Sequence, residues 1–152
     1  HDPQVYRLAR AVLARQNAMG EWAVGEKDHV NEARALFTEV RRRVRYTWDP
    51  LDYDAFQTPR KTLELQTADC DDYSSLLGAM LRAVGLKVRT RIVQTKGSDT
   101  WNHIYLAVGI PGKGPNGTDG WMPLDPSVKY PAGWEVPDSM VIRKKDYLVV
   151  EK

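Results

Sequence analysis

Apolar side chains in the first half of the chain recur with the period of a helix. Between residues 4 and 16, spacings of three and four predict an amphipathic helix. A second stripe covers residues 30–44, and Asp28 precedes it as a helix N-cap. The third stripe, residues 73–84, is the most regular, and Gly85 follows it where a glycine commonly ends a helix. We therefore expect three helices in this half.

The period changes to two after residue 86, which is typical of strands. The expected strands are residues 87–94, 101–108, 120–124 and 140–150. The glycine-rich stretch 109–120 is expected to be a hairpin loop, either a flap beside a site or a plain surface loop. Residues 46–68 show no sustained period and are expected to be a loop. Helices followed by strands predict an α+β fold with an antiparallel sheet, rather than alternating parallel units.

Length and composition indicate one globular domain that spans residues 1–152. The chain is 42% hydrophobic and 28% charged, as in ordinary soluble proteins, and no apolar run is long enough to span a membrane. A net charge of +2 argues against nucleic acid or a membrane surface as a partner. The chain begins with His1 rather than Met, so we expect a trimmed or excised sequence. A signal peptide could have been lost, and the compartment stays open.

The single cysteine, Cys70, is the first candidate for chemistry. One cysteine excludes an intramolecular disulfide and a zinc site built from several cysteines. Cys70 lies at the expected start of the third helix, with Asp69 as N-cap, and a helix N-terminus favours the thiolate. The carboxylates of Asp69, Asp71 and Asp72 oppose that effect. On spacing alone a buried structural cysteine is the commoner case, and a nucleophile here needs a base from elsewhere.

Two further residues supply a base and its partner. His103 lies in an expected strand, on the same face as Tyr105, and Asp125 ends the next strand just before Pro126. If these strands pair as a hairpin, the carboxylate of Asp125 approaches the imidazole of His103. A carboxylate in that position holds the imidazole tautomer and stabilises its cation, as a catalytic triad requires.

Three stretches of the sequence resemble the transglutaminase-like superfamily. Ala68-Asp69-Cys70-Asp71-Asp72-Tyr73-Ser74-Ser75-Leu76-Leu77 is similar to its nucleophile helix. Trp101-Asn102-His103-Ile104-Tyr105-Leu106 is similar to its histidine strand, and Gly120-Trp121-Met122-Pro123-Leu124-Asp125-Pro126-Ser127 to its aspartate segment. The resemblance covers about residues 30–127. It implies a papain-like core in which the nucleophile helix packs on the antiparallel sheet.

Carried over residue by residue, the resemblance makes Cys70 the nucleophile, His103 the general base and acid, and Asp125 the orienting carboxylate. The implied activity is a cysteine hydrolase, a peptidase or amidase, that cleaves an amide or isopeptide bond of a protein or peptide through a thioester. The alternatives are an amine acyltransferase that joins glutamine to lysine, and a catalytically silent module that binds protein or cell-wall material. No cofactor or metal is expected, and the oligomeric state stays open.

The proposed reaction also requires donors for an oxyanion. The backbone N–H of Cys70 at the helix start is one natural donor. Relatives often supply the second donor from a segment before the cysteine, where the candidates in this chain are Trp48, Gln66 and Tyr46. Trp48 is the first choice because an indole N–H only donates. Gln66 begins a stretch, Gln66-Thr67-Ala68, where many relatives carry glycines, which leaves the shape of the acyl entrance open.

Overall fold

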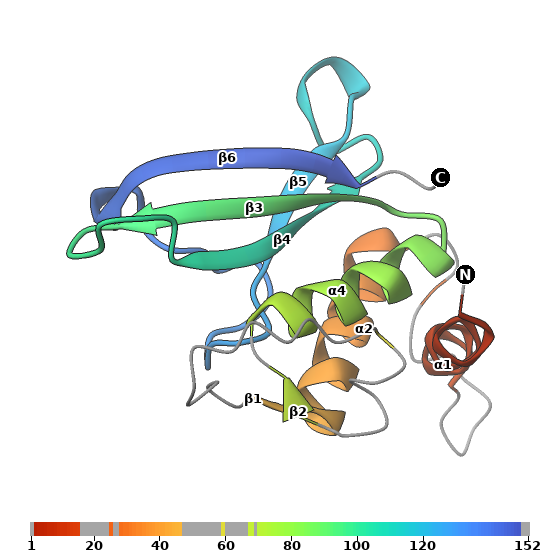
Figure 1. The fold of residues 1–152 in the computed structure, drawn as a ribbon. Coiled ribbons are helices and arrows are strands. Elements are labelled where there is room, and N and C mark those ends of the chain that lie inside the picture. The colour runs from red at the N-terminus through yellow and green to blue at the C-terminus, as the bar shows by residue number, and fades with distance from the viewer. Residues whose placement is uncertain are drawn as a thin grey trace.

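The structure, a computed structural model, describes residues 2–15, 25, 28–46, 59, 67–68 and 70–149, without the side chains of residues 46, 67 and 68 (Figure 1). The described helices are α1 (Pro3–Leu13), α2 (His29–Arg43) and α4 (Cys70–Ala83). The described strands are β1 (Arg45–Tyr46), β2 (Thr67–Ala68), β3 (Lys87–Thr95), β4 (His103–Ile110), β5 (Gly120–Leu124) and β6 (Val141–Val149). Helices precede strands, and the predicted α+β class is confirmed.

The principal sheet is antiparallel and has the strand order β5-β4-β3-β6. In Figure 1 the helix α4 runs beneath this sheet, α2 passes behind α4 with one end close to the sheet, and α1 lies farther from the sheet, below one end of α4. Helix α4, which carries Cys70, therefore packs on the antiparallel sheet, as expected. None of the described helices is long and apolar enough to cross a bilayer.

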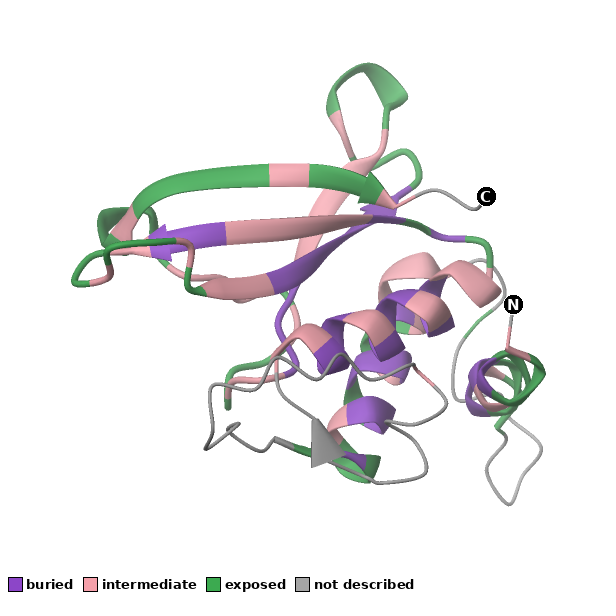
Figure 2. Ribbon diagram, viewed as in Figure 1, coloured by how far each residue is buried: buried purple, intermediate pink, exposed green. Residues whose placement is uncertain are grey.

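Burial explains why α4 is the central element. Its apolar residues contact the sheet on one side and α1 and α2 on the other, and Figure 2 shows buried positions on much of its surface. Five large side chains of α4 are at most 3% exposed: Tyr73, Leu76, Leu77, Met80 and Leu81. Each fully buried aliphatic side chain contributes ~1.5–3 kcal/mol to folding. The buried hydroxyl of Tyr73 also donates a hydrogen bond to the carbonyl of Val44.

The ends of the helices follow the expected capping chemistry. The Asp28 side chain accepts a hydrogen bond from the backbone N–H of Asn31, which caps α2. At the end of α4, Leu86 N donates to Leu81 O at 3.1 Å and Gly85 N to Arg82 O at 3.0 Å. This is a Schellman motif, and it requires the positive φ of 89° that Gly85 adopts. Both predicted helix ends are confirmed.

A buried carboxylate ties α1 to α2. Glu39 is 2% exposed and accepts hydrogen bonds from the guanidinium groups of Arg15, Arg42 and Arg43, at distances from 2.6 to 3.4 Å. These charge-assisted contacts satisfy a group that is costly to bury alone. Arg42 and Arg43, two of the three consecutive arginines at the end of α2, therefore pair with this carboxylate and do not face only solvent.

Two features differ from the expectations or refine them. The short parallel pair β1–β2 begins and ends the stretch 46–68, which was expected to be loop throughout. The loop 111–119 leaves β4 at Ile110 and enters β5 at Gly120, which are the ends opposite His103 and Asp125. Residues 104–110 of β4, at ~3.3 Å each, separate it from His103. The alternative of a flap beside these residues is therefore wrong, and the loop lies at the surface.

Candidate active site

Cys70 is the first residue of α4 and is partly exposed. The first four N–H groups of a helix have no partner within it, so the backbone around Cys70 presents donors at this end. Asp71 and Asp72 lie in the same first turn, and Asp72 is buried. Cys70 is therefore a partly exposed residue at the helix end that presents backbone donors, with two acidic residues next to it in the chain.

The hairpin β4–β5 brings His103 to Asp125. His103 begins β4, and Asp125 directly follows Leu124, which pairs with Leu106 in the ladder. The Nε2 atom of His103 lies 2.6 Å from Oδ2 of Asp125, whose side chain is 1% exposed. The predicted approach of these two groups is present in the structure.

Ser127 holds the carboxylate of Asp125 in place. Oδ1 of Asp125 accepts from the backbone N–H of Ser127 at 3.2 Å and from its hydroxyl at 2.6 Å. This local arrangement is an Asx turn, which fixes the carboxylate plane relative to the backbone. Oδ1 is thereby occupied, and Oδ2 is directed to His103. The sequence alone did not indicate a role for Ser127, although a serine two residues after an aspartate is a recognisable turn signal.

The electrostatics of His103 couple it to both partners. Burial lowers the pKa of the imidazole, but hydrogen bonds with Asp125 and then Cys70, together with their charges, raise the pKa from 6.5 to about 9. Because Nε2 is engaged by Asp125, Nδ1 is the ring nitrogen left for an interaction with Cys70. An imidazolium at neutral pH is the state that favours a neighbouring thiolate.

The candidate donors for an oxyanion fall largely outside the described residues. Trp48 and Gln66 lie there, as does Asp69, the expected N-cap of α4. Tyr46 belongs to β1, but its side chain is likewise not described. The second oxyanion donor therefore stays a prediction. Within the described ranges, no group of three His, Cys, Asp or Glu residues has the arrangement of a metal site.

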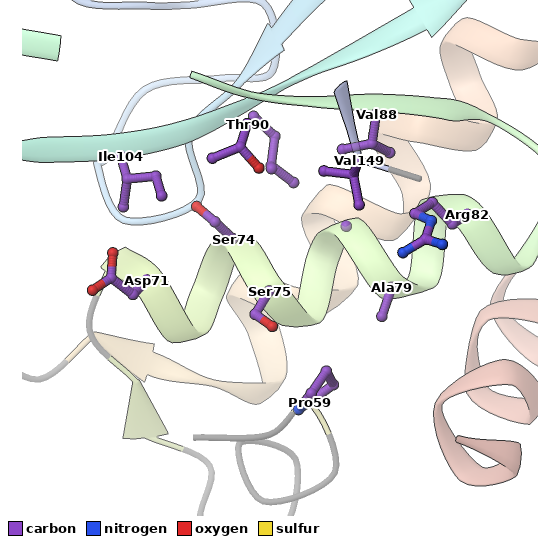
Figure 3. Close-up of a pocket in the computed structure, with 12 residues that line it drawn as sticks. Pro59, Asp71, Ser74, Ser75, Ala79, Arg82, Val88, Thr90, Ile104 and Val149 are labelled. Carbon is purple, nitrogen blue, oxygen red and sulfur yellow. The ribbon is translucent and has the colours of Figure 1, made fainter. Parts of the chain in front are cut away.

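A cavity of about 420 Å³ lies between α4 and the sheet (Figure 3). Its lining includes Asp71, which directly follows Cys70, so one end lies near the start of α4. It also includes Ile104, whose side chain points to the opposite face of β4 from that of His103. Ser74 lines it too, and its buried hydroxyl has no hydrogen-bond partner among the described residues. Most of the remaining wall is apolar or small, and it includes Gly78, whose missing side chain leaves space under the sheet.

The sequence profile of the transglutaminase-like superfamily matches residues 17–126. The chain belongs to this superfamily. The matched range contains Cys70, His103 and Asp125 and ends before the last strand. No curated protein sequence matches the chain.

Solved structures share the transglutaminase-like fold of the chain at low identity. A proposed protease from Parabacteroides distasonis is 11% identical with a TM-score of 0.60, over 84% of this chain and 23% of that one. A proposed cysteine protease from Cytophaga hutchinsonii is 15% identical with a TM-score of 0.60, over 93% and 42%. Calcium-bound LapG from Legionella pneumophila is 14% identical with a TM-score of 0.53, over 95% and 86%. The chain thus spans less than half of the first two proteins, and at these identities the likeness concerns the fold.

Proposed function

We propose that the chain is a cysteine hydrolase that cleaves an amide or isopeptide bond of a protein or peptide. Cys70 is the nucleophile, His103 the general base and acid, and Asp125 the group that orients His103. The observation that carries the proposal is the contact of His103 with the buried Asp125 at 2.6 Å. The interaction with Cys70 that helps to raise the pKa of the same imidazole supports it. Membership in the superfamily supports it.

Acylation begins from a thiolate and an imidazolium. The sulfur of Cys70 attacks the carbonyl carbon, and the carbonyl electrons move to oxygen. The backbone N–H of Cys70 at the start of α4 is a donor for that oxyanion. As the tetrahedral species collapses, His103 gives its proton from Nδ1 to the leaving nitrogen, and an amine departs. A thioester on Cys70 and a neutral imidazole remain.

Deacylation uses the same imidazole as a base. Neutral His103 removes a proton from water, the hydroxide oxygen attacks the thioester carbon, and the thiolate leaves. The products are a carboxylic acid and the original thiolate–imidazolium pair. Throughout, the hydrogen bond between Nε2 and Asp125 keeps Nδ1 directed toward Cys70 and stabilises the cation.

The partners of Asp125 support this assignment of roles. A carboxylate with both oxygens engaged, one by Ser127 and one by His103, has little freedom to turn. A mobile carboxylate would exchange between ring nitrogens and solvent, whereas this one fixes a single tautomer. An orienting group is effective because its own position is fixed in advance.

The test is the rate of iodoacetamide alkylation of Cys70 as a function of pH in the wild type and in His103→Gln. The proposal expects rapid labelling at pH 6–7 that falls by an order of magnitude or more in the variant, because a free thiol is largely protonated there. His29→Gln is the matched control, since His29 is also partly buried but lies at the start of α2. Equal labelling of the wild type and His103→Gln at neutral pH would refute the proposed pair.

An amine that replaces water in the second step would make the chain an acyltransferase. Turnover of a casein substrate with and without a fluorescent primary amine distinguishes the two: hydrolysis yields new amino termini or free ammonia, whereas transamidation attaches the fluorophore. A silent binding module predicts neither product, slow labelling of Cys70, and full binding activity in Cys70→Ala. Hydrolysis that disappears in Cys70→Ala supports the proposal.

A further inference from the structure

A cluster of polar side chains lies beside His103 on the sheet. By strand alternation Tyr105 shares the face of His103, and the ladder places Arg91 of β3 directly opposite Tyr105. Glu135 and Asp146 complete the cluster. These four residues, Arg91, Tyr105, Glu135 and Asp146, are called the brace below.

Tyr105 contacts the imidazole through its ring. The ring centroids of Tyr105 and His103 are 5.7 Å apart with an interplanar angle of 30°, which is an offset stack. Tyr105 is 0% exposed, so its ring has no room to swing away. The hydrogen bond to Asp125 sets the direction of the imidazole of His103 but still allows rotation of the ring plane about that bond. The stacked ring of Tyr105 restricts that rotation.

The hydroxyl of Tyr105 is fixed by a carboxylate that is itself fixed. Oε2 of Glu135 accepts from Tyr105 at 2.8 Å and from Arg91 Nη1 at 2.9 Å. Burial first, and then the hydrogen bond to Glu135, raise the pKa of the Tyr105 phenol, so it stays a donor at physiological pH. Each member of this chain of contacts is therefore oriented by the next.

Arg91 anchors the brace to the last strand. Its Nε and Nη2 atoms donate to the two carboxylate oxygens of Asp146 at 2.7 and 2.8 Å, a bidentate pair. The Arg91 side chain is only 12% exposed, so these contacts are well shielded from solvent. Glu135 and Asp146 both lie beyond residue 126, where the superfamily match ends.

We propose that the brace positions the imidazole of His103, and that Tyr105 and Glu135 are positioning residues of the cysteine hydrolase. This inference rests on the proposed function. The face of the Tyr105 ring favours a cation above it, so the stack also stabilises the imidazolium. The segment after residue 126 thereby contributes to a site whose three reactive residues all precede it.

The alternative is a cluster that stabilises the sheet and does nothing for His103. Two readouts separate these roles: the midpoint of the His103 titration, followed by NMR of ¹³C-histidine, and the alkylation rate of Cys70 at pH 7. A merely structural cluster lowers the melting temperature without moving either readout. Asp138→Asn is the matched control, because Asp138 contacts Lys144, a neighbour of Glu135, but is 93% exposed and does not touch Tyr105.

Tyr105→Leu is expected to lower the His103 midpoint by about 0.5 pH unit, the size of a modest cation–π contribution. Tyr105→Phe and Glu135→Gln are each expected to slow alkylation about threefold, the effect of one weakened hydrogen bond. The double variant is expected to be no slower than either single one, because both changes break the same contact. Asp138→Asn leaves both readouts unchanged.

Unchanged midpoints and rates in folded variants would overturn the inference, as would effects that multiply in the double variant. Variants are compared only below the onset of their thermal unfolding, and Tyr105→Phe keeps the buried ring in place. If wild-type alkylation does not depend on His103, the proposed function fails. The His103 midpoint in Tyr105→Leu then still decides whether Tyr105 acts on the imidazole.

Discussion

Asp125→Asn is expected to disable His103 as a base while the hairpin that carries both residues stays folded. In the wild type, Oδ1 of Asp125 accepts two hydrogen bonds from Ser127, and Oδ2 faces Nε2 of His103. An asparagine keeps its single oxygen toward the two Ser127 donors, so its amide N–H₂ faces His103. Nε2 must then accept, and a neutral imidazole carries its proton on Nδ1, the atom that faces Cys70.

The magnitude follows from the position of the His103 titration. Burial opposes protonation, yet the hydrogen bond to Asp125, the largest favourable contribution, and the contact with Cys70 bring the pKa to about 9. Relative to 6.5, this favours the imidazolium by roughly 3 kcal/mol at ~1.4 kcal/mol per unit. When the carboxylate charge is removed, one of the interactions that raise the pKa of His103 is lost, and the lowering of the pKa by burial is opposed less strongly. The midpoint in Asp125→Asn is expected to fall by about two pH units or more, to the region of 7 or below.

The assay is a titration of ¹³C-histidine signals by NMR. The chain has three histidines, so His103→Gln assigns the signal by its disappearance. Hydrolysis at pH 7.5, once a substrate is in hand, is expected to fall by a factor of about 10³–10⁴, as when a triad loses its orienting carboxylate. A His103 midpoint that stays near 9 in Asp125→Asn would refute the reasoning, because the carboxylate would then not be what holds the proton.

Three further predictions concern stability. The pKa of Glu39 is lowered to about 2, since hydrogen bonds from its three arginines outweigh burial. The stabilisation of the fold by ionised Glu39 is therefore complete above about pH 4.5 and is lost as the pH falls toward 2. Glu39→Gln is expected to lower the free energy of unfolding in urea by on the order of 1–2 kcal/mol at pH 7, a modest loss because the arginines are partly solvent-screened. The loss is expected to be smaller at pH 3, and an equal loss at both pH values would contradict this. Gly78→Ala is expected to stabilise the fold by up to ~1 kcal/mol, since its Cβ would meet Leu106 at 3.6 Å, an ordinary contact, in the middle of α4; a lower melting temperature would show that the sheet cannot accept it. Gly85→Ala is expected to cost ~1 kcal/mol because φ is 89°, and an unchanged melting temperature would mean that the turn relaxes.

The elements that carry periodic signals were predictable. The stripe from residue 73 to 84 and the glycine after it fix α4, because its apolar side chains are buried against the sheet and two helices. Alternation predicted β3 and β4, the segments of β5 and β6 were expected to be strands as well, and the expected hairpin predicted the approach of His103 and Asp125. These features depend on local spacing, which a sequence displays directly.

The brace could not be predicted, because its contacts join residues far apart in the chain. Glu135 lies in a segment without regular period, and nothing in its neighbourhood in the sequence indicates Arg91 or Tyr105 as partners. The pair β1–β2 could not be predicted either, because strands of two residues are too short to show a period. Such contacts depend on how distant segments pack in the folded protein, and the spacing of residues along the sequence does not show that packing.

The order of the strands has a consequence for the newly made protein. β3 lies between β4 and β6, so the sheet is unfinished until β6, the last strand, has been synthesised and has docked. The helix that carries Cys70 leaves the ribosome several seconds earlier, at roughly 5–20 residues per second. With Glu135 and Asp146 still inside the exit tunnel, the brace beside His103 is absent. A nascent chain therefore exposes the thiol of Cys70 before the proposed positioning of His103 is complete, which requires Asp146 to emerge from the exit tunnel and pair with Arg91.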